Sequence, residues 1–103
     1  MGEYVTVGSA DQVAAGAMES FKLDGHVVAV ANVGGTLHAF NNVCTHRGCP
    51  LAKGRLEGTT VTCPCHGSQF DVTSGAVLHG PAEKPVDSFA VRMEGGEIQV
   101  QLP

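Results

Sequence analysis

The chain has 103 residues, which suits a single domain over 1–103, with 43% hydrophobic and 16% charged residues. This balance excludes a disordered chain, and the longest apolar run, Val27 to Ala31, is too short to span a membrane. A net charge of −4 with Lys and Arg totalling 6 excludes the basic surface of a nucleic-acid binder. The first ten residues lack the basic and apolar stretches of a signal peptide, so we expect a cytoplasmic protein without a membrane anchor.

The strand and turn signals predict an all-β fold, starting with a strand over 4–7. Ser9 and Gln12 have the spacing of a capping box, and Gly16 ends any helix there within about two turns. Two hairpins are expected, 26–33 with 36–40 and 88–93 with 98–102. Each closes on a Gly-Gly pair, a turn type in which both central residues need positive φ.

Alternating apolar residues in the second hairpin predict one buried face, made of Phe89, Val91, Met93, Ile98, Val100 and Leu102. Residues 41–85, between the hairpins, are rich in Cys, Gly, Pro and His, with short strands expected at 60–62, 69–72 and 76–78. Long loops in a small domain usually carry its function. We therefore expect a β-sandwich or barrel base, about 1–40 and 86–103, with an inserted subdomain, about 41–85, that holds a site.

All four cysteines of the chain lie in this insert, and two of them have a histidine close behind. Cys44 precedes His46 by two residues, and Cys63 precedes His66 by three. In a chain without an export signal such cysteines indicate metal binding or catalysis more than a disulfide framework. Two thiolates and two imidazoles can enclose one zinc ion, or can serve two irons unequally, and spacing alone leaves both open. A thiol–disulfide enzyme built on Cys63-Pro64-Cys65 is disfavoured, because the βαβ context of such enzymes is missing.

The two boxes, C-T-H-R-G-C at 44–49 and C-P-C-H-G-S at 63–68, resemble those of the Rieske iron–sulfur family, in particular its cytochrome bc branch. Residues 80–82 and 85–86 resemble the proline-bearing third loop that covers the cluster in that family. The resemblance extends from about Tyr4 onward. It implies a Rieske-like base with a cluster-binding subdomain.

The resemblance also assigns roles to individual residues. Cys44 and Cys63 would bind the inner iron of one 2Fe–2S cluster, and His46 and His66 would bind the outer iron. The Ser68 hydroxyl would donate a hydrogen bond to a cluster sulfide, and the extra pair, Cys49 and Cys65, would form a disulfide between the loops. The branch has a tyrosine where this chain has Phe70, so one hydroxyl donor is missing.

The implied function is that of a ferredoxin that carries one electron and is not an enzyme by itself. Neutral imidazoles in place of two thiolates raise the potential of such a cluster to between about −150 and +300 mV, against about −400 mV for plant-type ferredoxins. Its partners would be a reductase and an oxygenase or another oxidoreductase. Two alternatives remain open: an electron-transfer subunit of a larger complex, and a structural zinc module.

Overall fold

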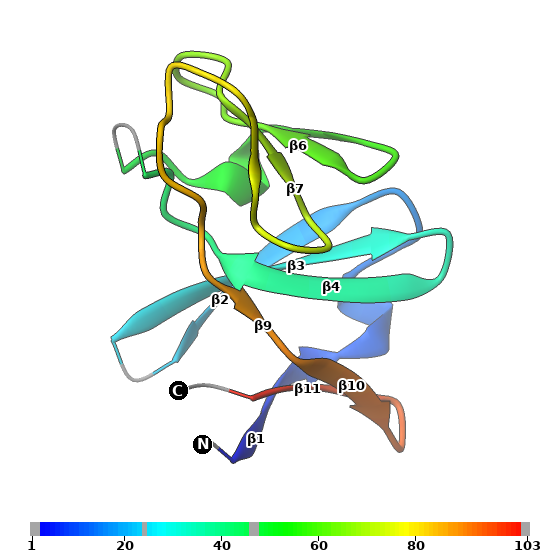
Figure 1. The fold of residues 1–103 in the computed structure, drawn as a ribbon. Helices are drawn as coiled ribbons and strands as arrows, with labels where there is room; N and C mark the ends of the chain where they lie inside the picture. The colour runs from blue at the N-terminus through cyan, green and yellow to red at the C-terminus, as the bar shows by residue number, and fades with distance from the viewer. Residues whose placement is uncertain (1–2, 24, 46–47, 102–103) are drawn as a thin grey trace.

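The computed structural model describes residues 3–23, 25–45 and 48–101, which form three antiparallel sheets stacked along the molecule (Figure 1). The first has the strand order β1-β11-β10, the second β2-β3-β4-β9 and the third β5-β6-β7-β8. The strands are β1 Tyr4–Ser9, β2 Met18–Leu23, β3 His26–Val33, β4 Thr36–Asn41, β5 Arg55–Glu57, β6 Thr60–Thr62, β7 Gln69–Asp71, β8 Val77–His79, β9 Ser88–Phe89, β10 Val91–Glu94 and β11 Glu97–Gln101. Two single-turn 3-10 helices accompany them, η1 Ala10–Gln12 and η2 Leu51–Lys53. The prediction of an all-β fold is confirmed.

Both Gly-Gly turns have the predicted backbone. The φ angles are 60° and 97° at Gly34 and Gly35, and 57° and 82° at Gly95 and Gly96. A side chain at these positions would be strained, because only glycine adopts positive φ without steric cost. The capping signal at Ser9 produces only the short η1, in which the Gln12 side chain accepts a hydrogen bond from the Ser9 N–H at 2.8 Å.

The middle sheet is covered on both of its faces, which explains the unbroken apolar run in β3. Ala29 and Ala31 pack on one side, in a core shared with the third sheet through Val61 and Phe70. Val28 and Val30, which alternate with them, pack on the other side in a core shared with the first sheet through Ile98 and Val100. A strand buried on both faces is apolar throughout instead of alternating.

Three elements of the structure were not predicted, namely β2, η2 and β5. The segment Met18–Leu23 has no β-branched residue, and it becomes a strand through its register with β3, from Met18 opposite Ala31 to Leu23 opposite His26. Pairing with a neighbouring strand here overrides local propensity.

The prediction of one continuous strand over 88–93 is wrong. The structure divides it, so that β9 pairs with β4 in the middle sheet and β10 pairs with β11 in the first. The predicted burial holds for Ile98 and Val100, whereas Met93 on the edge strand β10 is 48% exposed. Leu102 lies outside the described residues.

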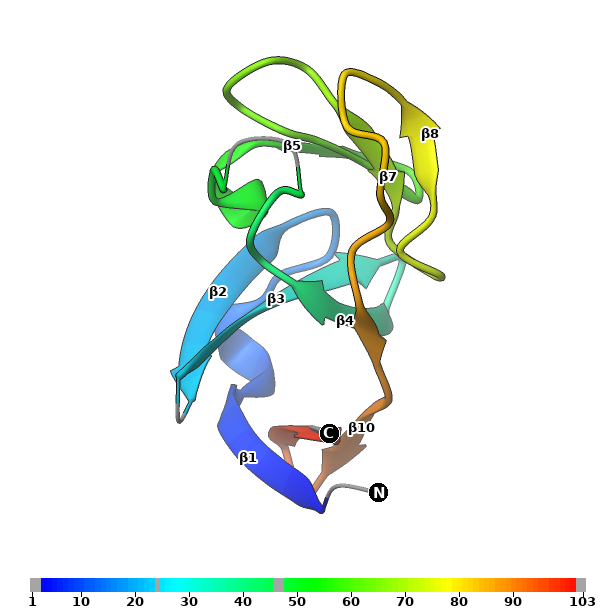
Figure 2. The ribbon, with the colours of Figure 1, turned by 60° about the vertical axis from the view of Figure 1, so that its left-hand side comes forward.

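Figure 2 shows the third sheet and its long loops at one end of the molecule, and β1 and β10 at the other. Every strand of the third sheet comes from residues 55–79, within the insert expected from the sequence. The buried Asn42 connects the middle sheet to this end. Its N–H donates to the Val27 carbonyl at 2.9 Å, and its Oδ1 accepts the Ala52 N–H at 2.8 Å, so the chain is fixed just before the first cysteine.

Candidate metal centre

The first cysteine loop is closed by its own backbone. The Cys44 N–H donates to the Cys49 carbonyl at 3.0 Å, and the Gly48 N–H donates back to the Cys44 carbonyl at 2.8 Å. Gly48 has a φ of 71°, a left-handed conformation that glycine adopts freely. His46 and Arg47 lie outside the described residues, so the predicted ligand role of His46 stays a prediction.

The second cysteine loop repeats this hydrogen-bond pattern at the same residue offsets. The Cys63 N–H donates to the Ser68 carbonyl at 2.7 Å, and the Gly67 N–H donates to the Cys63 carbonyl at 3.3 Å. Gly67 has a φ of 77°, equivalent to that of Gly48. The signal in the sequence is the glycine four residues after Cys44 and Cys63, a structural role that was not predicted.

The leading cysteines of the two loops are free thiols buried in the core, 2% exposed at Cys44 and 3% at Cys63. Burial raises the pKa of the Cys63 thiol, and a hydrogen bond with the Cys44 side chain raises it further. The backbone N–H groups of Cys65 and His66 donate to the Cys63 sulfur and oppose this shift. The backbone donors favour a thiolate at Cys63 once a metal replaces its proton.

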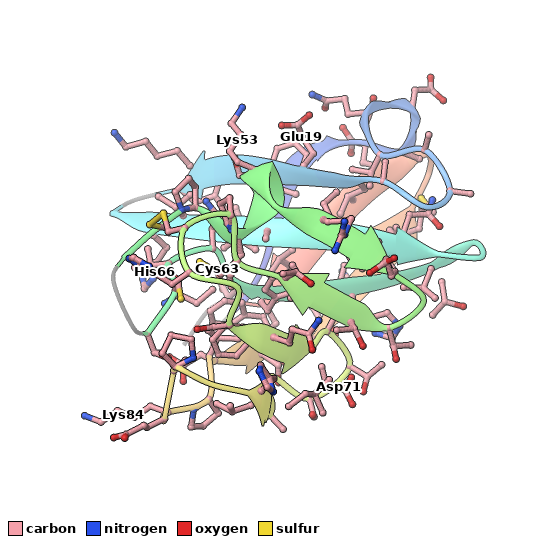
Figure 3. The ribbon with its side chains drawn as sticks, turned by 90° about the horizontal axis from the view of Figure 1, so that it is seen from above. Glu19, Lys53, Cys63, His66, Asp71 and Lys84 are labelled. Atoms are coloured by element: carbon pink, nitrogen blue, oxygen red, sulfur yellow. A yellow bond between two sulfur atoms is a disulfide. The ribbon has the colours of Figure 1, made fainter. Side chains whose placement is uncertain are left out.

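A disulfide between Cys49 and Cys65 joins the two loops, as the sequence analysis predicted. Its Cα atoms are 6.4 Å apart, within the range that an unstrained bridge allows. Figure 3, viewed from the end that carries the third sheet, shows this bridge close to the labelled His66. His66 is exposed, while Cys63 three residues before it is buried.

The predicted third loop is hydrogen-bonded to both cysteine loops. Ser68 is fully buried, and its Oγ accepts a hydrogen bond from the Ala82 N–H at 3.0 Å. Thr45, which sequence reasoning missed, donates its hydroxyl to the Lys84 carbonyl at 2.6 Å. Thr45 and Lys84 line a cavity of about 380 Å³ together with Pro81 and Glu83.

The described donor set fits an iron–sulfur cluster. The two buried thiols of Cys44 and Cys63 could supply soft anionic ligands, and the exposed His66 could supply a nitrogen from the second cysteine loop. The oxygen of Ser68 is already used as an acceptor, so its hydroxyl proton is available to a sulfide in this buried place. Such outer hydrogen bonds tune the energy of a metal centre.

Comparison with known proteins identifies the family of this chain. Residues 3–90 match the family described as the Rieske [2Fe-2S] domain. The chain is 38% identical, over 82% of its length and 82% of the relative's, to the 3-phenylpropionate/cinnamic acid dioxygenase ferredoxin subunit of Shigella flexneri serotype 5b. Its structure resembles the ferredoxin of carbazole 1,9a-dioxygenase from Nocardioides aromaticivorans IC177 with a TM-score of 0.90 at 33% identity, covering 95% of this chain and 96% of that one. It also resembles a chain from a complex of reduced oxygenase and oxidized ferredoxin in carbazole 1,9a-dioxygenase, with a TM-score of 0.89 at 30% identity, covering 95% and 92% of the two chains.

The chain belongs to the Rieske [2Fe-2S] family. It is a ferredoxin-type electron carrier whose cofactor is one 2Fe–2S cluster, which supplies a site that accepts and releases one electron. The zinc module and the thiol–disulfide enzyme are therefore set aside. No helix among the described residues has the length and apolar character needed to cross a membrane.

Proposed function

We propose that this protein carries electrons from a reductase to the terminal oxygenase of a multicomponent dioxygenase. The observation that supports this most strongly is the exposed His66 beside the buried Cys63, which gives a buried redox site a short path to the surface. The ferredoxin subunits among its relatives, and the solved oxygenase–ferredoxin complex to which it is similar, support the same partners. An electron-transfer subunit of a larger complex is the alternative.

The proposed ligands are Cys44 and Cys63 on the inner iron and His46 and His66 on the outer iron. We also propose the division of the single domain into a base, about 1–40 and 86–103, and a cluster-binding part, about 41–85. Two observations support this scheme: the matching hydrogen bonds of the two cysteine loops, and a third sheet made only from residues of the insert.

Metal analysis of matched variants tests these ligands. We expect about two irons and two sulfides per chain in the purified protein, and none in the Cys44→Ser or Cys63→Ser variants. Cys49→Ser and Cys65→Ser should still bind iron, because those sulfurs lie in the disulfide. Nitrogen coupling in the electron paramagnetic resonance spectrum of the reduced protein should be altered by His66→Ala and unaffected by His38→Ala. An all-thiolate spectrum would refute the ligand assignment.

We propose that the partner docks on the end shown in Figure 3, where Lys53 and Lys84 lie on either side of Cys63 and His66. These two lysines are the cations that we propose contact an acidic patch of the partner, beside the neighbouring Glu19 and Glu83. Lys53→Glu and Lys84→Glu should slow electron delivery to a purified oxygenase and weaken its salt dependence, while Lys22→Glu serves as the control. Co-purification with a large subunit in a fixed ratio would favour the alternative.

The kinship with the cytochrome bc branch is likewise a proposal, supported by the Cys49–Cys65 bridge and the buried Ser68. We propose a potential above that of ferredoxins lacking these residues and below that of the branch, which has a tyrosine where this chain has Phe70. Phe70→Tyr should raise the potential, because a hydroxyl donor to a cysteine sulfur stabilises the electron-rich state. An unchanged potential would show that this hydroxyl does not reach the cluster.

We propose the cytoplasm as the location of the protein, beside a reductase, and cell fractionation tests this.

A further inference from the structure

Three cysteine sulfurs meet at the junction of the two cysteine loops. The Sγ atoms of Cys49, Cys63 and Cys65 all lie within 4.8 Å of one another. Thiolates bound to one zinc ion at 2.3 Å in a tetrahedron stand about 3.8 Å apart. Once the bond between Cys49 and Cys65 is cut, their sulfurs separate, and a small inward movement of Cys63 gives the spacing that zinc needs.

We propose that reduction of the Cys49–Cys65 disulfide creates a second metal site, in which Cys49, Cys63 and Cys65 bind one soft divalent cation such as Zn²⁺. Thiolates are the ligands such cations prefer, and a water molecule completes the tetrahedron. Because Cys63 is also a proposed ligand of the cluster, the reduced chain holds either the ion or the cluster. This competition rests on the proposed role of Cys63, whereas the zinc site itself does not.

The burial of the bridge determines how it is opened. Cys65 is exposed and Cys49 is half-buried, so a thiolate of a dithiol reductant attacks the Cys65 sulfur. The S–S bond breaks, Cys49 leaves as the thiolate, and a mixed disulfide with Cys65 forms. The second thiol of the reductant then attacks its own bound sulfur and releases Cys65. The dithiol is oxidised to a cyclic disulfide, and its two electrons and two protons pass to Cys49 and Cys65. In a second step, Zn²⁺ binding releases one proton from each of the three thiols.

The loops keep the three sulfurs together after the bridge is cut. Cys63 and Cys65 are two residues apart around Pro64, and the Cys63 N–H is held by the Ser68 carbonyl at 2.7 Å. Cys49 is held through its own carbonyl, which accepts the Cys44 N–H at 3.0 Å. While the disulfide is intact, Cys49 and Cys65 cannot bind zinc as thiolates, and Cys63 can bind the cluster. In this reading it directs metal selection as well as joining the loops.

The test uses the full-length chain freed of its cluster, with the bridge intact or reduced by a dithiol that is then removed without oxygen. Titration with Zn²⁺ against a chromophoric chelator should give one ion per reduced chain, bound at least about 100-fold more tightly than by the oxidised chain. Cd²⁺ should produce a more intense thiolate charge-transfer band after reduction, because the oxidised chain offers only the thiols of Cys44 and Cys63. Equal affinities in the two states overturn the proposal, as does loss of amide dispersion in the nuclear magnetic resonance spectrum of the reduced, zinc-bound chain.

Variants separate this site from the cluster site. Cys49→Ser and Cys65→Ser should each weaken zinc binding by about 100-fold, and the distant His38→Ala should leave it unchanged. Cys44→Ser should lose the cluster but bind zinc within a few-fold of the parent chain. Strong zinc loss in Cys44→Ser, or none in Cys49→Ser and Cys65→Ser, overturns the assignment. A chain that never takes up iron and sulfide would refute the proposed function and leave the zinc result standing.

Discussion

Replacing Ser68 by alanine tests the tie between the third loop and the cluster in two independent measurements. The Ser68 hydroxyl is fully buried and accepts the Ala82 N–H at 3.0 Å, and Ala82 is itself only 4% exposed. Without the hydroxyl this N–H has no acceptor in a buried place, which costs about 1–3 kcal/mol. We expect urea unfolding of the holoprotein to show a loss of stability of that size.

The same substitution should lower the potential of the cluster. A hydrogen bond to a charged group contributes about 1.5–3 kcal/mol. The potential depends only on how much stronger this bond is in the reduced state than in the oxidised state. A difference of ~1 kcal/mol corresponds to ~40 mV for a one-electron couple, so we expect a fall of about 40 mV in a redox titration.

Ser74→Ala is the matched control for both measurements. The Ser74 hydroxyl also accepts a backbone N–H, that of Ala76 at 3.2 Å, but this bond is exposed and lies in the turn between β7 and β8. Its loss should change the stability by less than about 0.5 kcal/mol and leave the potential unaltered. A Ser68→Ala chain with the parent's potential would refute the proposed bond to the cluster, and one with the parent's stability would refute the contribution of the Ala82 contact.

Two further predictions concern the turn that follows β7. Gly75→Ala should destabilise the protein by about 1–3 kcal/mol in urea unfolding, because φ is +84° and a Cβ would meet the Val86 carbonyl oxygen. The control is Gly96→Ala, which has a similar φ of +82° but open space around it, so it measures the backbone strain alone. Equal losses in the two variants would contradict this. Asp71 accepts hydrogen bonds from the Thr73 N–H and hydroxyl, which lower the pKa of its carboxyl, so the stability that it contributes should be lost as the pH falls from about 5 to 2. Thr73→Val should flatten that acid limb, and an unchanged pH profile would show that the hydroxyl has no influence.

The hairpins could be predicted from the sequence because their signals are local. Gly34-Gly35 and Gly95-Gly96 determine the turn type by themselves, and β-branched residues flank the first pair. The edge strand β2 could not be predicted in this way. Its residues carry mixed polarity, and its conformation comes from partners in β3 that only the folded chain provides.

The division of residues 88–93 between two sheets is also a tertiary effect. Ala90 lies between β9 and β10, and nothing in the alternating pattern marks it as the point where the chain leaves one sheet for the next. The exposure of Met93 follows from the same geometry, because β10 lies at the edge of its sheet. Hydrophobic alternation shows which residues share a face and does not show whether that face is covered.

The position of the candidate site could be predicted because all four cysteines lie in one insert, whereas the ligand roles came from the family resemblance and stay a prediction. The Cys49–Cys65 pairing came from the family resemblance, since spacing alone does not determine disulfide connectivity. Contacts that depend on backbone atoms could not be predicted. One of them is the hydrogen bond from the Thr45 hydroxyl to the Lys84 carbonyl, 39 residues away in the sequence. A hydroxyl that binds a carbonyl leaves no pattern in the sequence.

The matching hydrogen bonds of the two cysteine loops bear on the speed of electron transfer. Each loop holds its leading cysteine through two backbone hydrogen bonds that involve neither the thiol nor any ligand. Because these bonds fix the backbone around the site, we expect only a small nuclear rearrangement when the charge of the site changes by one unit. We therefore expect the rate of electron exchange to depend chiefly on the distance to the partner and the lifetime of the complex.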